Sequence, residues 1–402
     1  MKISENAKKA IMIGSMCSFS YLAVYIARNL LSAVTPQMLE GGAFTEEFIG
    51  NISSVYFFVY AIGQLINGAI GDKIKARYMI SFGLLLAGLC NLFFPLVSHL
   101  PWAVTAVYGA TGFFLAMIYG PMTKVVAENT EPIYATRCSL GYTFASFIGT
   151  PAAGMLAAFL AWQSVFYVGS GVLILMGCVC FGVFLAYEKK GFIRYGRYTA
   201  EKKVGGVKIL IKHRIVKFAF ISFLTGIVRT SVVFWLPVYL AQALAFSSSE
   251  ASAIFSASTL VISATAFIAI FIYEKLGYNM DKTILLMFAL SAFFFCGVFF
   301  IKFPWVNLVL MVLAIMSANG AACMLWSRYC PGLRDTGMVS VATGFLDFIS
   351  YMAAALANAV FGTAVAVVGW DNLILIWLAL MGIGIFVALP YDRLFCKKSP
   401  TA

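Results

Sequence analysis

The sequence has little charge. Only 11% of its 402 residues are Asp, Glu, Lys or Arg, whereas soluble domains carry about 25%. Acidic residues are the scarcer sign, 16 against 28 basic ones, and the formal net charge is +12. Hydrophobic residues make up 62% of the chain and the mean hydropathy is +0.93. This composition excludes a soluble fold, because the charge cannot cover a water-facing surface, and it fits the lipid bilayer as solvent.

Motifs for catalysis and for metal binding are also missing. The two histidines, His99 and His213, fall in polar breaks, and the nine cysteines form no CxxC pair and no Cys/His cluster. We expect these cysteines to act as small packing residues. The chain carries no Walker loop, which excludes an ATP-driven pump within it. We therefore expect no enzyme, no cofactor and no metal.

Long apolar runs are abundant. A helix that crosses about 30 Å of hydrocarbon needs about 20 apolar residues, and the alternation typical of a membrane β-barrel is absent. The sequence therefore predicts an all-α integral membrane protein with twelve transmembrane helices, the first of them retained rather than cleaved because Arg28 lies at its middle. The predicted spans are 10–39, 46–71, 77–98, 101–127, 135–160, 163–187, 214–243, 247–273, 282–301, 304–327, 336–366 and 370–390.

The basic residues gather in alternate loops. They are dense at Lys2 to Lys9, Lys73 to Arg77 and Lys189 to Lys217, whereas Glu40 and Asp371 fall in the opposite loops. This pattern follows the positive-inside rule. It predicts a multi-pass protein of the cell membrane with both termini and the central loop in the cytoplasm. The positive charge is then a topology signal and a contact to anionic lipid, and not a sign of nucleic-acid binding.

The chain divides into two similar parts. The polar stretch 188–213 separates a six-helix half at 1–187 from a six-helix half at 214–402. Arg28, Pro36 and Leu39 recur 201 positions later as Arg229, Pro237 and Leu240. Two six-helix halves related along the membrane normal are typical of the major facilitator fold, whose site lies between the halves near the midplane.

A loop motif agrees with this fold. Gly68, Asp72, Lys73 and Arg77 resemble the G-x-x-x-D-R/K loop of that superfamily. Gly68 permits close helix approach, and Asp72 can meet a helix N-terminus or an arginine of the other half. We expect these four residues to act in gating. The alternative is a charged turn set by topology alone.

Three charges lie deep inside the predicted spans: Arg28, Arg229 and Asp347. A buried arginine costs at least about 2.5 kcal/mol at the bilayer centre, so it normally faces a cavity and has a function. Polar stripes at helical spacing accompany these charges, which favours a wet cavity over interfacial belts or simple packing. The stripes are Tyr21, Tyr25 and Arg28; Tyr56, Tyr60 and Gln64; Tyr142, Ser146 and Thr150; and Thr343, Asp347, Tyr351 and Asn358.

The two arginines suit the binding of an anion. A guanidinium group binds phosphate or carboxylate through two parallel hydrogen bonds and stays ionised. The alternative is that an arginine pairs permanently with a buried acid such as Asp347. One acid cannot neutralise both arginines, which favours anion binding.

The stretches around Tyr21 to Arg28, around Val228 to Leu240, from Tyr60 to Gly68 and from Thr343 to Tyr351 resemble the organophosphate:phosphate antiporter family. The resemblance runs over most of both halves. It implies that Arg28 and Arg229 bind the phosphoryl group and that the nearby tyrosines line the site. The substrate-binding set is then Arg28, Arg229, Tyr21, Tyr25, Tyr60, Gln64 and Tyr351.

This chain departs from the family at several positions, one of them in span five, where a relative has a histidine and this chain offers only Ala145 or Ser146. Asn29 stands where some relatives have a lysine, Gln64 stands where some have a basic residue, and Asp347 adds a carboxylate. We expect Asp347 to be a counter-ion that substrate displaces, or else a proton carrier if it is desolvated without a partner.

The predicted function is secondary transport of a small organic anion, most specifically an organophosphate exchanged for inorganic phosphate by alternating access. The partners are then the small anionic substrate and the lipid bilayer, and the chain is a monomer. Two alternatives stay open: a proton-coupled carboxylate or drug carrier of the same fold, and a sugar-phosphate sensor that does not transport.

Overall fold

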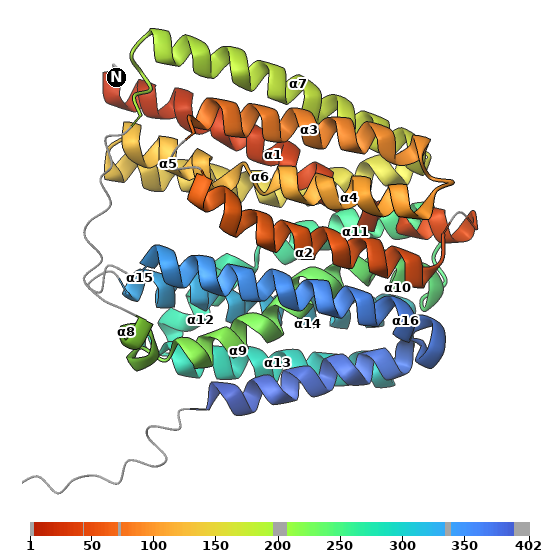
Figure 1. Ribbon diagram of the computed structural model, residues 1–402. Helices are drawn as coiled ribbons and strands as arrows, with labels where there is room; N and C mark the ends of the chain where they lie inside the picture. Colours follow the sequence, from red (N-terminus) through yellow and green to blue (C-terminus); the bar gives the residue numbers. More distant parts are fainter. Residues whose placement is uncertain (1–3, 43, 71–73, 196–206, 334–338, 390–402) are drawn as a thin grey trace, which may run out of the picture. The chain divides into compact units, whose positions relative to one another are not determined.

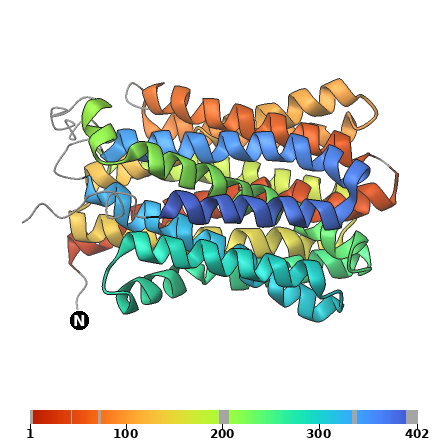
Figure 2. The same ribbon diagram turned by 90° about the horizontal axis from the view of Figure 1, so that it is seen from below.

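The computed structural model is all helical over the residues it describes, which are all except 1–3, 43, 71–73, 196–206, 334–338 and 390–402 (Figures 1 and 2). The helices of the N-terminal part are α1 (Glu5–Glu40), α2 (Glu46–Ile70), α3 (Ala76–Leu96), α4 (Pro101–Leu115), α5 (Tyr119–Asn129), α6 (Pro132–Phe159), α7 (Trp162–Lys189) and α8 (Val207–Lys212). The helices of the C-terminal part are α9 (Ile215–Gly226), α10 (Val233–Gln242), α11 (Ser248–Ser263), α12 (Thr265–Lys275), α13 (Met280–Phe300), α14 (Pro304–Met324), α15 (Cys330–Gly332) and α16 (Val339–Ala388), with π-helical turns η1 (Ile227–Val232) and η2 (Leu325–Tyr329).

Ten stretches of described helix are long and apolar enough to cross a membrane. Helix α6 adds 28 residues, of which Phe144–Phe159 are apolar. Helix α16 consists of two arms, because Gly369 between them has a non-helical backbone with φ 73° and ψ 173°. The all-α membrane fold is therefore confirmed. The count of twelve spans stays a prediction that α6 and the two arms of α16 would complete.

The chain folds into two compact units. Unit 1 comprises Met1–Glu201, Phe234–Val261 and Ala354–Val367. Unit 2 comprises Lys202–Val233, Ile262–Ala353 and Val368–Ala402. Within each unit the long helices run along a shared direction in both views (Figures 1 and 2), as helices that cross one layer must. The predicted repeat of halves at 1–187 and 214–402 is a statement about the sequence and stays a prediction.

Unit 1 is built on the packing of α1 with α6, of α3 with α7 and of α2 with α4 (Figure 1). Hydroxyl groups of α11 join it: Ser252 donates a hydrogen bond of 2.9 Å to the carbonyl oxygen of Ala33, and Ser256 donates one of 2.6 Å to that of Pro151. Hydroxyl-to-carbonyl bonds of this kind stabilise helix contacts where water is absent.

Helix α2 and the first arm of α16 approach each other closely in the same unit. A Cβ atom added to Gly362 would lie 2.6 Å from the carbonyl oxygen of Glu46 and 3.0 Å from the Cα atom of Gly50. Only glycine fits there, since real Cβ atoms do not come so close. The side-chain amide of Asn358 donates a hydrogen bond of 2.9 Å to Ser53 one helical turn away. These contacts explain why residues 354–367 belong to unit 1 although they are distant in sequence.

Unit 2 is built on the pairs α13 with α14 and α12 with α14. Its two ends are marked by charge. At one end Lys217 of α9 lies 3.0 Å from Asp281 of α13. At the other end Lys302 lies 2.5 Å from Asp371. Arg214 lies 3.3 Å from the same Asp281 carboxylate, and we call this end the basic end of unit 2.

Candidate functional site

In unit 1 the central feature is Arg28, near the middle of α1. Its guanidinium carbon lies 5.8 Å from the ring centre of Tyr25. The ring centres of Phe57 and Tyr60, both on α2, lie 5.5 and 5.4 Å from the same carbon. We call Tyr25, Phe57 and Tyr60 the aromatic cage. Ring faces within about 6 Å attract a cation through the ring quadrupole, so the cage stabilises the charge of Arg28 without neutralising it.

Further tyrosines extend the cage over two more helices. Tyr21 on α1 contacts Tyr119 of α5 with ring centres 5.4 Å apart. Tyr56 stacks on Tyr60 at 6.1 Å and on Tyr108 of α4 at 4.8 Å. Two helices therefore contribute the rings around Arg28, two more contribute rings that pack on neighbouring tyrosines, and the phenol groups bring hydrogen-bonding hydroxyls into an apolar setting.

Two of the positions at which the chain departs from the family, Asn29 and Gln64, follow the cage residues on α1 and α2. The Asn29 side-chain amide donates hydrogen bonds of 2.7 Å to the carbonyl oxygen of Tyr25 and 3.1 Å to the hydroxyl of Thr150 in α6. Gln64 is half-buried one turn beyond Tyr60 on α2. The amide of Asn29 thus ties the cage helix α1 to α6.

In unit 2 the central feature is Arg229, which lies in the π-helical turn η1 between α9 and α10. Such turns occur inside α-helices mostly as single bulges, often at functional sites. The Nη2 atom of Arg229 donates a hydrogen bond of 3.3 Å to the hydroxyl of Ser350 on α16. The ring centres of Trp326, in the second π turn η2, and of Tyr351 lie 5.9 and 6.0 Å from its guanidinium carbon.

A carboxylate accompanies this arginine. Asp347, one turn before Tyr351 on α16, places its Oδ1 atom 3.9 Å from Nη2 of Arg229. This distance exceeds the 2.7–3.2 Å of a hydrogen bond, so Asp347 compensates charge rather than clamping the guanidinium group. Both side chains are about one-third exposed, 31% for Arg229 and 30% for Asp347. A small solute can therefore contact each of them.

A glycine allows this arrangement. A Cβ atom added to Gly226, just before η1, would lie 2.6 Å from the carbonyl oxygen and 2.8 Å from the Cα atom of Ser350. Helices α9 and α16 therefore touch backbone to backbone at this point. The close approach brings Ser350 and Asp347 within reach of Arg229.

The structure brings most predicted site residues into two groups, one in each unit. Arg28, Tyr25 and Tyr60 lie together in unit 1, and Tyr21 is joined to Tyr25 by an edge contact of 5.0 Å. In unit 2 the group is Arg229, Asp347 and Tyr351. That these residues bind substrate stays a prediction.

Sequence reasoning missed three neighbours of the arginines: Phe57, Trp326 and Ser350. Phe57 is apolar and resembles any lipid-facing residue of its span. Trp326 belongs to no polar stripe. Ser350 could have been predicted, since it directly precedes Tyr351 in the polar stripe of Thr343, Asp347, Tyr351 and Asn358.

The loop motif is only partly described. Asp72 and Lys73 lie outside the described residues, and Gly68 lies in the last turns of α2. Arg77, at the start of α3, donates a hydrogen bond of 2.8 Å to Glu188 of α7, and its guanidinium carbon lies 4.6 Å from the ring centre of Tyr78. The partner of Arg77 is thus within unit 1, and a gating role for the four residues stays a prediction.

The Glu188 carboxylate accepts a second hydrogen bond. The hydroxyl of Tyr195, beyond the end of α7, donates a hydrogen bond of 2.8 Å to Glu188. Burial, together with this bond to a carboxylate, raises the pKa of Tyr195 above its ordinary value. The phenol therefore stays protonated and fastens the start of the central loop to α3 and α7.

The chain is similar in sequence to known membrane proteins. Over 92% of its length the chain is 20% identical to a "Probable hexose phosphate transport protein" of Chlamydia pneumoniae, 88% of which is covered. It is 20% identical over 92% of its length to the "Membrane sensor protein UhpC" of Escherichia coli, with 89% covered. The name of the chlamydial relative agrees with the predicted resemblance to organophosphate transporters.

The fold is also found among solved structures. A bacterial homolog of the human lysosomal transporter Spinster matches with a TM-score of 0.75 at 14% identity, covering 99% of this chain and all of the other. The model of the Major Facilitator Superfamily matches residues 17–358. Its members move solutes and are not enzymes. The chain is therefore a membrane transporter that belongs to the Major Facilitator Superfamily.

Proposed function

We propose that this protein carries a small organic phosphate ester across the cell membrane in exchange for inorganic phosphate. The observation that carries the proposal is that two membrane helices each hold an arginine among aromatic and hydroxyl side chains. An arginine inside a span costs about 2.5–3.5 kcal/mol on insertion scales. A cost of that size is retained where the charge has a task, and binding an anion is the task that suits guanidinium.

The chemistry of each group fits a phosphate ester. The forked guanidinium donors of Arg28 and Arg229 match phosphate oxygens. The hydroxyls of Tyr25, Tyr60 and Ser350 add donors within the same two groups. The name of the chlamydial relative, a hexose phosphate transport protein, supports an organic phosphate as the cargo.

The transport cycle we propose is alternating access, in which two six-helix halves, 1–187 and 214–402, open in turn to either side. Substrate can drive this change only by binding one state more tightly than the other. We propose that the protein works as a monomer in the cell membrane, with both termini and the 188–213 linker in the cytoplasm. Gly68, Asp72, Lys73 and Arg77 would control the cytoplasmic opening.

The test is exchange of labelled inorganic phosphate in proteoliposomes that contain the full chain. We expect saturable exchange from the wild type and a loss of about 100-fold in Arg28→Lys and in Arg229→Lys, because lysine cannot form the two-pronged contact. The matched control is Arg194→Lys, since Arg194 is an exposed arginine of the central loop. Absence of exchange from folded wild-type protein would overturn phosphate antiport.

A second candidate is a proton-coupled carrier of carboxylates or drugs, which Asp347 supports because it lies close enough to Arg229 to share its charge. Such a carrier would take up substrate with protons, and inorganic phosphate would not compete. Competition by phosphate at submillimolar concentration therefore separates the two candidates.

A third candidate is a sensor that binds sugar phosphate without moving it, and the name of the Escherichia coli relative supports it. A sensor would bind a hexose phosphate and give no flux. Flux of many turnovers per protein in the same proteoliposomes would exclude it.

A further inference from the structure

Unit 2 has a groove at its basic end that the transport proposal does not use. It lies between the start of α9 and the end of the second arm of α16 and has a volume of about 580 Å³, a size typical of small-molecule sites. Its walls are Val216 and Phe220 on α9 and Ile383, Phe386 and Val387 on α16.

The walls of the groove face the hydrocarbon. Val216 and Phe220 are four residues apart and are 55% and 57% exposed; Ile383 and Phe386 are three apart and are 51% and 66% exposed. Residues at these spacings share a helix face. On helices that cross a membrane, an exposed apolar face contacts lipid chains, so the groove is open to the lipid and not to water.

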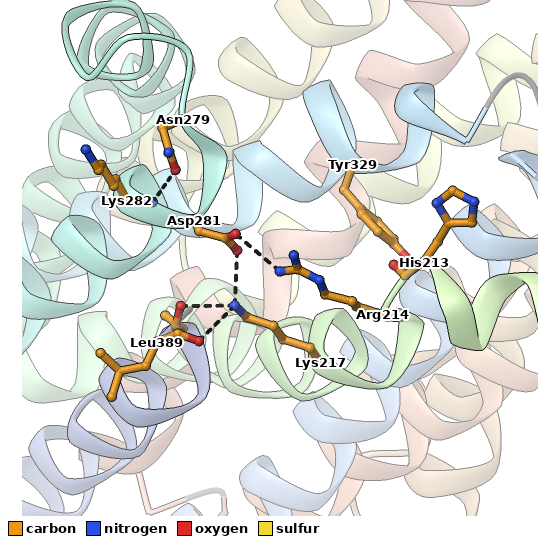
Figure 3. A network of polar contacts seen from close by, with 9 residues as sticks. His213, Arg214, Lys217, Asn279, Asp281, Lys282, Tyr329 and Leu389 are labelled. Atoms are coloured by element: carbon orange, nitrogen blue, oxygen red, sulfur yellow. Dashed lines mark hydrogen bonds and ion pairs between the residues drawn. The ribbon is translucent and has the colours of Figure 1, made fainter. Parts of the chain in front are cut away.

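The end of the groove is positively charged. Arg214 and Lys217 both line it. Figure 3 shows the two cations directed toward Asp281, with Lys217 at 3.0 Å and Arg214 at 3.3 Å from its carboxylate oxygens. Two cations thus share the carboxylate of Asp281 at this end of the groove.

The two cations have different positions. Lys217 is only 14% exposed, and its ammonium group also donates hydrogen bonds of 3.0 and 3.2 Å to the carbonyl oxygens of Ala388 and Leu389 (Figure 3). It therefore closes the end of α16. The Arg214 side chain is 44% exposed, on a residue whose backbone is left-handed with φ 60°. A non-glycine residue in this conformation is uncommon and is found preferentially at functional positions.

We propose that this groove is a binding site for one anionic phospholipid. The phosphate lies at Arg214, and an acyl chain lies along Val216, Phe220 and Phe386. Charge complementarity favours an anionic over a zwitterionic headgroup, because basic pockets between membrane helices attract anionic lipid and guanidinium binds phosphate oxygens in pairs. The proposal does not depend on which solute the protein transports.

The proposal is tested by native mass spectrometry of the purified full chain, titrated with dioleoyl phosphatidylglycerol or with dioleoyl phosphatidylcholine. We expect one phosphatidylglycerol to bind about five to ten times more tightly than phosphatidylcholine, because both lipids offer a phosphate but only phosphatidylglycerol keeps a net negative charge beside the two cations. Arg214→Gln should remove this preference, and Phe220→Ala should weaken both lipids. The matched controls are Lys190→Gln, an exposed cation of unit 1, and Phe93→Ala, an exposed lipid-facing ring; both should bind as the wild type does.

Three outcomes would overturn the proposal. The first is a phosphatidylglycerol preference that survives Arg214→Gln. The second is an equal loss in Lys190→Gln, which would indicate diffuse surface charge. The third is competition by glycerophosphoglycerol, the headgroup without chains, at the concentration of the lipid, which would indicate a soluble anion.

A measurement on the wild type keeps the proposal testable if a variant fails to fold. Hydrogen exchange in nanodiscs of either lipid should show slower exchange in phosphatidylglycerol for Ile215 to Phe220 and no change for the end of α3. Equal exchange of Ile215 to Phe220 in both lipids would contradict the site.

Discussion

The surroundings of Arg28 and Arg229 differ although the two residues occupy matching places in the sequence. Three aromatic rings lie around the guanidinium group of Arg28. Around Arg229 lie two rings, a hydroxyl at 3.3 Å and a carboxylate at 3.9 Å. Rings stabilise a cation and leave its charge in place, whereas a carboxylate at 4 Å offsets a large part of it.

We expect this difference to give the two arginines different tasks. We expect Arg28, with three rings around its guanidinium group, to attract an anion through its paired donors. The charge of Arg229 is shared with Asp347, so an anion that binds there must compete with a carboxylate. Residues 201 positions apart in the sequence can therefore have different surroundings, and four changes test whether Arg28 and Arg229 also differ in function.

The largest effect is expected from Arg28→Gln. Glutamine keeps the length of the side chain but removes the charge and the paired donors. Hydrogen bonds to a charged group contribute about 1.5–3 kcal/mol each, so loss of the pair should weaken phosphate binding by about 100-fold. Scintillation proximity binding of labelled phosphate to purified protein measures this, with Arg194→Gln as the control. Unchanged binding would remove Arg28 from the site.

The next largest effect is on the stability of the protein and on the surroundings of Arg229. Gly226→Ala places a methyl group against the backbone of Ser350, and overpacking of this kind costs about 1–3 kcal/mol. We expect a midpoint of thermal unfolding lower by several degrees, together with weaker phosphate binding. The control is Gly182→Ala on α7, where nothing lies within 4 Å of the added methyl; it should be neutral or stabilising. Equal stability of the two variants would show that α9 and α16 can separate without cost.

A smaller effect, opposite in sign, is expected from Asp347→Asn. Removing the carboxylate beside Arg229 should strengthen phosphate binding about fivefold, the size of a partly exposed charge contact. The same fivefold gain is expected in Arg28→Gln, which leaves Arg229 and Asp347 in place, since changes at residues that share no contact add. The control is Asp371→Asn in the exposed pair with Lys302.

The same variant separates the two roles of Asp347. If Asp347 is a counter-ion, its replacement leaves the shape of the uptake profile unchanged between about pH 6 and about pH 8, about one unit either side of neutral. As a proton carrier, its loss abolishes the dependence of uptake on a pH gradient. A flat profile in Asp347→Asn beside a steep one in the wild type would contradict the counter-ion role.

The sequence was sufficient for the membrane fold and for the charged positions. An apolar run of about 20 residues has few alternatives to a membrane helix, so the predicted span 214–243 agrees with the observed Ile215–Gln242. Arg28 and Arg229 were found because a charge in such a run is conspicuous. The shared face of Tyr25 and Arg28 followed from helical spacing alone.

What surrounds each arginine could not be predicted in the same way. Arg229 and Ser350 are 121 residues apart, and their contact depends on how closely α9 crosses α16 at Gly226, which no local pattern encodes. The π turn at Ile227–Val232 adds a residue to one helical turn and so shifts the face on which Arg229 lies. An apolar ring such as Phe57 carries no mark that distinguishes a cage from a lipid contact.

The smallest effect is expected from Phe57→Leu, at the ring whose role the sequence could not predict. Leucine keeps the apolar volume and removes one ring face from the cage, and a cation–π contact of this kind contributes about 0.5–1 kcal/mol. Phosphate binding should therefore weaken about threefold, because Arg28 is held less firmly. The control is Phe58→Leu, one residue along the same helix, whose ring is 45% exposed and faces outward. If the two variants bind phosphate equally, the rings around Arg28 are ordinary packing, and the contrast between the arginines reduces to the carboxylate beside Arg229.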